Sequence, residues 1–244
     1  MKPLIYLSIL ACLLGFVPSL VVAQDLTVSL GDEESLSART IQLFALITVL
    51  SLAPGLAIMV TCFPFIVTVL SILRQAIGLQ ASPPNMLIVS LAMFLTYFVM
   101  EPVFTQAWKQ GLEPLTNQEI DAETAFVETL IPFREFMAAR LDADTYTEMA
   151  ALRPDTQGIE LSPDSPLSVL IPSFLLSEIS RAFQVGFLVF LPFLVIDLVV
   201  AAVLMSMGMM MVPPVIVSLP FKLAFFVVAD GWSLIAGSLV RSYY

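Results

Sequence analysis

The chain has 244 residues, of which 59% are hydrophobic and 12% are charged, against about a quarter charged in soluble domains. Its mean hydropathy of +0.95 is typical of an integral membrane protein. Ten basic residues face twenty acidic ones and there is no histidine, which excludes a nucleic-acid partner, His-based triads and His-ligated metals.

The first 23 residues have the pattern of a secretory signal peptide. Lys2 precedes an apolar stretch from Leu4 to Val17, and small residues follow at Val21-Val22-Ala23. We expect cleavage before Gln24, because Pro18 and Ser19 would break the helix just ahead of that site; an uncleaved signal anchor is the alternative. Cleavage would remove Cys12 and leave Cys62 as the one thiol.

Residues 24–40 form a short polar and acidic segment, and residues 41–108 are predicted to be a first helical hairpin. Its first arm is a charge-free run from Thr40 to Leu73, long enough to cross a bilayer with tilt. The second arm runs from Met86 to Trp108. The connector between the arms contains Pro83-Pro84, which breaks helices.

Residues 109–170 are acidic and are predicted to be a small extracytoplasmic region. Apolar residues near helical spacing between 126 and 141 predict one short amphipathic helix there. Residues 153–166, rich in proline and glycine, are predicted to be a loop.

Residues 171–244 are predicted to be a second hairpin, whose arms run from Ile171 to Met207 and from Val212 to Val240. Its turn holds five methionines between Met205 and Pro214 and no charge, although turns that meet water or headgroups normally carry polar or basic residues. Methionine side chains are flexible and fill irregular gaps. If several copies met around an axis, these tips would form a soft seal; the alternative is that the methionines only fill a core.

The predicted fold is therefore all-α, with four long apolar helices of integral-membrane type in two hairpins. An N-terminus outside the membrane and four crossings would put the acidic region outside and both tight turns inside. The basic residues support this topology only weakly, since Arg74 is the one basic residue in either inner turn.

Four ionisable residues interrupt the last two apolar segments: Glu178, Asp197, Lys222 and Asp230. A charge inside an apolar segment is costly and usually faces a partner or a cavity, so we expect these charges to be buried and to fix assembly. Asp197 and Lys222 lie equally far from the centre of the methionine turn and could pair within one subunit or between two; each could instead pair elsewhere.

Glu178 and Arg181, three residues apart, could also pair, or both could meet water at the segment end. Asp197 and Asp230 are a weak signal for an intramembrane aspartyl protease. The sequence contains no P-loop, dinucleotide fingerprint or cysteine-pair metal motif. We therefore expect no catalytic, cofactor-binding or metal-binding residues, and no enzyme.

Several contiguous motifs resemble one family. They are Pro192 to Pro214, Ser218 to Leu223, Asp230 to Leu234, Pro64 to Gly78, Pro83 to Asn85 and Gly237 to Tyr243. They are similar to the FliP family, subunits of the flagellar type III export gate, over about 41–108 and 170–244. The related injectisome subunits often have Ser-Pro where this chain has Pro213-Pro214, and they often lack a cleaved signal.

The resemblance implies a subunit of a closed helical assembly in the bacterial inner membrane and flagellar basal body, partly in the periplasmic plane. It implies about five copies of the chain with FliQ-type and FliR-type subunits, next to FlhB-type and FlhA-type components, around a path for unfolded flagellar proteins. It also implies that Met209, Met210 and Met211 form the gasket of that path. The alternative functions are a proton-coupled transporter, with Asp197 or Asp230 as the carrier, and the homologous injectisome export-gate subunit.

Overall fold

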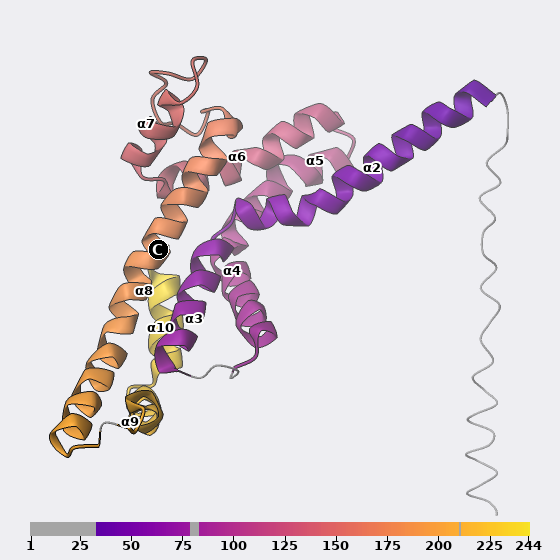
Figure 1. Cartoon of the computed structure of the whole chain (residues 1–244). Helices are drawn as coiled ribbons and strands as arrows, with labels where there is room; N and C mark the ends of the chain where they lie inside the picture. Colours follow the sequence, from indigo (N-terminus) through magenta and orange to yellow (C-terminus); the bar gives the residue numbers. More distant parts are fainter. Residues whose placement is uncertain (1–32, 79–82, 210) are drawn as a thin grey trace, which may run out of the picture. The chain divides into compact units, whose positions relative to one another are not determined.

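The computed structural model describes residues 33–78, 83–209 and 211–244, so the expected signal peptide at 1–23 lies outside the described residues. The chain forms two compact units, residues 1–51 and 52–244. Within the first unit, the described residues belong to helix α2 (Glu33–Met59) and expose Ile41, Leu43 and Phe44. Every regular element of the described chain is a helix (Figure 1), which confirms the all-α prediction.

The predicted first span is two helices. α2 ends at Met59, and α3 (Phe63–Ile77) begins after a turn at Val60–Cys62. Pro64 lies in the first turn of α3, where its missing N–H is tolerated. α3 ends at Gly78, whose φ of 88° places it in the left-handed region that favours glycine.

The next elements are one continuous helical rod and two separate helices. The rod consists of α4 (Asn85–Ala107), the π-helical turn η1 (Trp108–Leu112) and α5 (Glu113–Thr116). Two helices follow, α6 (Ala122–Arg140) and α7 (Ala143–Ala151). The side chains of Asp121 and Asp142 accept backbone N–H groups of Thr124 and Thr145 and cap these two helices. Residues 152–166 contain no helix, as predicted.

The C-terminal part consists of α8 (Leu167–Ser206), α9 (Pro214–Val228) and α10 (Gly231–Arg241). The fourth long helix predicted over Val212 to Val240 is instead two shorter helices, because the chain bends by 61° between α9 and α10. A Cβ atom at Gly231 would collide with the ring of Phe226, so the ring lies across the bend. In the described chain, two helices are long and apolar enough to cross a membrane, or three if α9 and α10 count as one broken span.

Two buried clusters hold residues 52–244 together. In the larger one, α3 is central: Phe65, Leu70 and Leu73 are fully buried, and α3 packs against α4, α8 and α9. In the smaller one, Tyr146 of α7 and Met137 of α6 pack on the first turns of α8. The acidic region therefore docks onto α8 and is not a separate domain; Figure 1 shows α6 and α7 near the N-terminal end of α8.

We predict that Gly111→Ala destabilises this arrangement. Gly111 is buried in η1, where an added Cβ would lie 2.7 Å from the carbonyl oxygen of Ala125 in α6. Because a backbone atom cannot move aside cheaply, we expect a loss of about 1–3 kcal/mol, typical of overpacking. Thermal unfolding of the purified protein, followed by circular dichroism, measures it.

Gly55→Ala is the matched control, since a Cβ at Gly55 meets no heavy atom within 4 Å and alanine favours helix. An unchanged melting temperature for Gly111→Ala would contradict the close approach of η1 and α6.

Candidate functional site

The methionine turn ends α8 in a defined hydrogen-bonded motif. Met209 N–H donates to the Leu204 carbonyl at 3.0 Å, and Gly208 N–H donates to the Met205 carbonyl at 3.0 Å. This is the Schellman pattern, with Gly208 at the left-handed position (φ 74°). The turn after α8 is thus fixed by its backbone, and its side chains need not hold it closed.

The described methionines of this turn face outward. Met207 is 66% exposed, Met209 is 41% exposed and Met211 is 97% exposed; Met210 lies outside the described residues. They do not fill the core of their own chain, so the alternative interpretation of these methionines as core filler does not hold for them.

Asp197 and Lys222 meet within one chain. Lys222 Nζ lies 2.6 Å from Asp197 Oδ2, and the Ser218 hydroxyl donates to Asp197 Oδ1 at 2.6 Å. Lys222 is 4% exposed, and its ammonium also donates to the Ala76 carbonyl at the end of α3, 3.1 Å away. One side chain therefore joins α3, α8 and α9.

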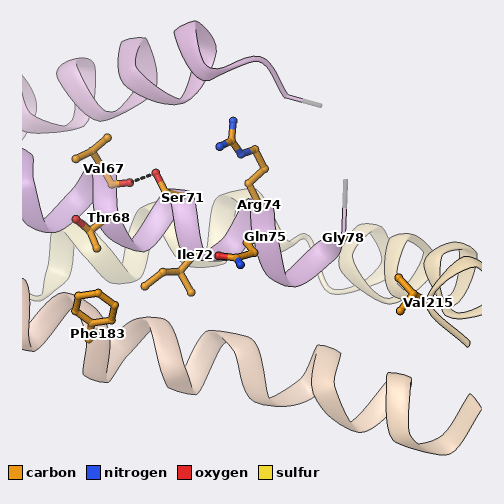
Figure 2. A pocket seen from close by; sticks show the side chains of 9 residues that line it. All are labelled: Val67, Thr68, Ser71, Ile72, Arg74, Gln75, Gly78, Phe183 and Val215. Carbon is orange, nitrogen blue, oxygen red and sulfur yellow. Dashed lines mark hydrogen bonds between the residues drawn. The ribbon is translucent and has the colours of Figure 1, made fainter. Parts of the chain in front are cut away.

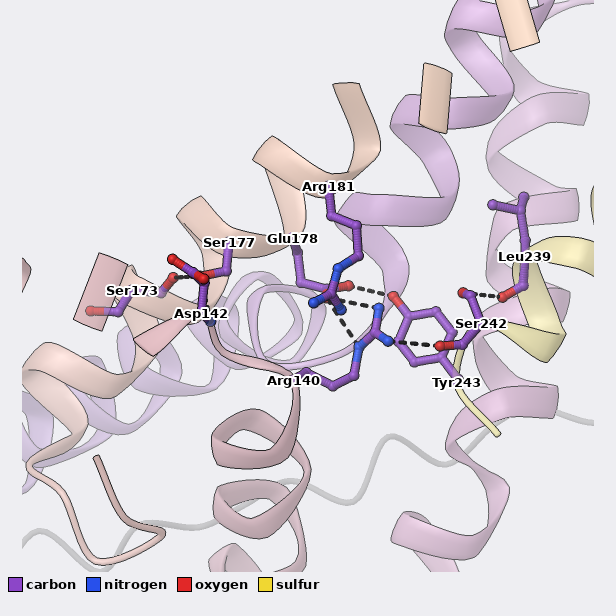
Figure 3. Close-up of polar contacts among 9 residues, drawn as sticks. All are labelled: Arg140, Asp142, Ser173, Ser177, Glu178, Arg181, Leu239, Ser242 and Tyr243. Atoms are coloured by element: carbon purple, nitrogen blue, oxygen red, sulfur yellow. Dashed lines mark hydrogen bonds and ion pairs between the residues drawn. The ribbon is translucent and has the colours of Figure 1, made fainter. Parts of the chain in front are cut away.

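A second buried charge, Glu178 of α8, is fully enclosed. Figure 3 shows Arg140, Arg181 and Tyr243 converging on it. Arg140 Nη2 lies 3.2 Å from Glu178 Oε1, and Arg181 Nη1 lies 3.7 Å from the same oxygen. The predicted Glu178–Arg181 pair is thus present, and Arg140 is a partner that sequence reasoning missed.

The C-terminal residues close this cluster. The Tyr243 hydroxyl donates to Glu178 Oε2, while Arg140 stacks on the Tyr243 ring at 4.0 Å and donates to the Ser242 carbonyl at 2.7 Å. Burial, then the Glu178 charge, raises the pKa of the Tyr243 phenol far above its usual range, so the hydroxyl keeps its proton. The end of the chain is therefore fastened to α6 and α8.

The prediction that Asp230 is a buried charge is wrong. It is exposed at the bend between α9 and α10 and adopts the left-handed conformation, with φ 47°. The reason is the break in the predicted helix: the bend turns Asp230 out of the apolar packing. No three potential metal ligands converge in the part of the chain that the structure describes.

Two grooves lie along the helices that Lys222 joins. One, of about 700 Å³, lies along α3 and reaches Phe183 and Val215; Figure 2 shows Arg74 and Ile72 pointing to opposite sides of α3 at this groove. Gly78, on its edge, is also next to Lys222. The other groove, of about 540 Å³, lies between α8 and α9 and is lined entirely by apolar residues, among them Val199, Val203 and Phe221.

These helices define an all-helical, membrane-associated class of protein. The sequence model of the FliP family matches residues 46–239. The chain is 48% identical to the flagellar biosynthetic protein FliP of Caulobacter vibrioides, over 97% of this chain and 88% of that protein. It is 45% identical to the protein of the same name from Bacillus subtilis, over 88% of this chain and 96% of that protein.

The chain therefore belongs to the FliP family. Its relatives are named flagellar biosynthetic proteins, which connects the chain with flagellum biogenesis, and its helices are those of a membrane-associated flagellar component.

We predict that Glu178→Gln is strongly destabilising. It removes the charge that compensates Arg140, whose side chain is only 15% exposed, and breaking a buried pair costs about 3–5 kcal/mol. Tyr243→Phe removes one hydrogen bond to the carboxylate and should cost about 1–3 kcal/mol. Thermal unfolding of the unsubstituted protein and the two variants measures how much stability each substitution removes.

The control is Arg153→Ala, because the Arg153–Asp155 pair is exposed and such pairs contribute about 0–1 kcal/mol. If Glu178→Gln cost no more than Arg153→Ala, the cluster would not hold α6 to α8.

Proposed function

We propose that the chain is a pore-forming subunit of the flagellar type III export gate, and that unfolded flagellar proteins pass through the assembled gate. The observation that carries this proposal is the methionine turn. It is uncharged, its backbone is fixed, and its described methionines face away from the core of their own chain. Such a tip is suited to a soft, adaptable contact that closes around a variable chain.

The gate is an assembly of copies of this chain with partner subunits. Membership of the family and the uncovered apolar groove between α8 and α9 support an assembly of about five copies. FliQ-type and FliR-type subunits would complete the gate, and FlhB-type and FlhA-type components would adjoin it. The assembly lies in the bacterial inner membrane within the flagellar basal body, with part of its helices in the periplasmic plane.

The subunit acts by packing and gating and catalyses no reaction. The Asp197 carboxylate is held by Lys222 and Ser218, which suits a structural role better than that of a proton carrier or one half of an aspartyl dyad. In this mechanism the buried pairs set the register of α3, α8 and α9, and the methionine tips close the central path.

We predict that replacing Met209, Met210 and Met211 with alanine raises the leak of small ions through assembled gates. Alanine shortens each side chain and leaves an opening that the backbone turn, fixed by Gly208, cannot close. Conductance of gates reconstituted in planar bilayers measures the leak.

Met86→Ala is the control, because Met86 is also exposed, at 82%, but lies at the start of α4. A triple variant that conducts no more than the wild type would contradict the seal.

A second prediction separates the gate from a transporter. Asp197→Asn leaves the Lys222 ammonium buried without a counter-charge, which costs about 3–5 kcal/mol, so we expect the complex to be lost. Native gels of membranes that contain the tagged chain show whether it assembles.

Ser218→Ala is the milder companion variant: it removes one hydrogen bond to Asp197 and keeps the ion pair, so it should assemble. A transporter predicts the opposite result for Asp197→Asn, a complex that remains assembled and has lost proton coupling.

A further inference from the structure

Among the charges that form no ion pair with a described residue, one follows an apolar stretch directly and is used by none of the contacts above. Glu101 lies on α4, immediately after the 15 uncharged residues from Met86 to Met100. Its side chain is exposed, and among the described residues its one hydrogen bond comes from the Thr105 hydroxyl, 3.3 Å from Oε1. A carboxylate at the end of an apolar helix usually faces a partner of opposite charge.

Three aromatic rings line the same cavity as this carboxylate. Tyr97, Phe104 and Trp108 lie on the same stripe of the helix as Glu101, at spacings of three or four residues. Together with Glu101 and Thr105 they line a cavity of about 220 Å³. Aromatic faces with a carboxylate among them attract ammonium groups, through cation–π contact and charge-assisted hydrogen bonds.

An apolar cavity adjoins this one. It has a volume of about 330 Å³ and shares two of its lining residues, Tyr97 and Phe104, with the charged cavity. Its remaining walls include Met93, Ile58 and Phe63. Met93 is eight residues before Glu101, about 12 Å along the helix axis toward the apolar end. The two cavities thus have a charged end and a hydrocarbon-like end.

The position along α4 matches the boundary of a bilayer. The uncharged stretch before Glu101 is about 22 Å long, and tyrosine and tryptophan side chains, here Tyr97 and Trp108, are enriched where hydrocarbon meets headgroups. Both are more than half exposed.

We propose that this groove binds a membrane phospholipid with a primary ammonium headgroup. The ammonium lies between the Glu101 carboxylate and the rings of Tyr97, Phe104 and Trp108, and an acyl chain occupies the apolar cavity toward Met93. A lysine of a partner protein would satisfy the carboxylate but would leave the apolar cavity open, because its stem has only four carbons. The continuous apolar extension therefore favours a lipid.

Fluorescence quenching tests the site, because Trp108 is one of only two tryptophans. In the full-length Trp232→Phe protein, Trp108 is the one reporter. The probes are vesicles in which either phosphatidylethanolamine or phosphatidylglycerol, at equal mole fraction, carries brominated acyl chains. We expect stronger quenching by the ethanolamine lipid and, for Glu101→Gln, a preference reduced by about fivefold or more.

The matched control is Glu113→Gln, which removes an exposed carboxylate from the same helical rod outside the groove and should keep the preference. Equal quenching by the two lipids, or an unchanged preference in Glu101→Gln, would overturn the proposal.

Two further measurements keep the test decisive. Native mass spectrometry of the unsubstituted chain should show about one retained ethanolamine lipid per protomer, and this adduct should be lost from Glu101→Gln. A photo-crosslinker at Thr105 should capture lipid. If only protein adducts formed at that position, a partner subunit would occupy the groove, and the proposed lipid site would be wrong.

Discussion

The buried ammonium of Lys222 is the contact on which the arrangement of α3, α8 and α9 depends. Desolvating an ammonium costs several kcal/mol, and only close, well-directed acceptors offset that cost. Asp197 and the Ala76 carbonyl provide them, from two other helices. Apolar packing alone would tolerate a slip of one helix along another, whereas the position of Lys222 allows only one register. The methionine turn is therefore held at a fixed distance from the end of α3.

The Glu178 cluster likewise fixes how α6 and the C-terminal residues pack on α8. Its three partners come from α6, from α8 itself and from the C-terminus. Arg140 contacts both the carboxylate and the tyrosine ring, so one side chain matches the charge and covers a face of the ring. The last residues of the chain thus complete the site at which the acidic region docks, and their loss would expose a buried carboxylate.

Much of this could be predicted from local pattern. The methionine turn, the loop at 153–166 and the pairing partner of Asp197 follow from breaker residues and from symmetry about a turn. The contacts of Glu178 with Arg140 and Tyr243 could not, because they join residues 38 and 65 positions apart, and no periodicity records such distances. The break between α9 and α10 was also missed: hydropathy stays high across it, and the close approach of Phe226 to Gly231 that accompanies it exists only in three dimensions.

The length of α8 bears on what covers its apolar surface. Its 40 residues extend about 60 Å, twice the hydrocarbon thickness of a typical bilayer, about 30 Å. Exposed apolar side chains nevertheless occur along most of it, from Leu176 through Phe187 to Val203. The stretch from Leu176 to Val203 is about 40 Å long, so at the typical tilt of about 20° part of this surface lies outside hydrocarbon, where uncovered apolar area is unfavourable. Protein is the remaining material that can bury it, and so the helix that most strongly suggests a membrane span is also the strongest argument for neighbouring subunits.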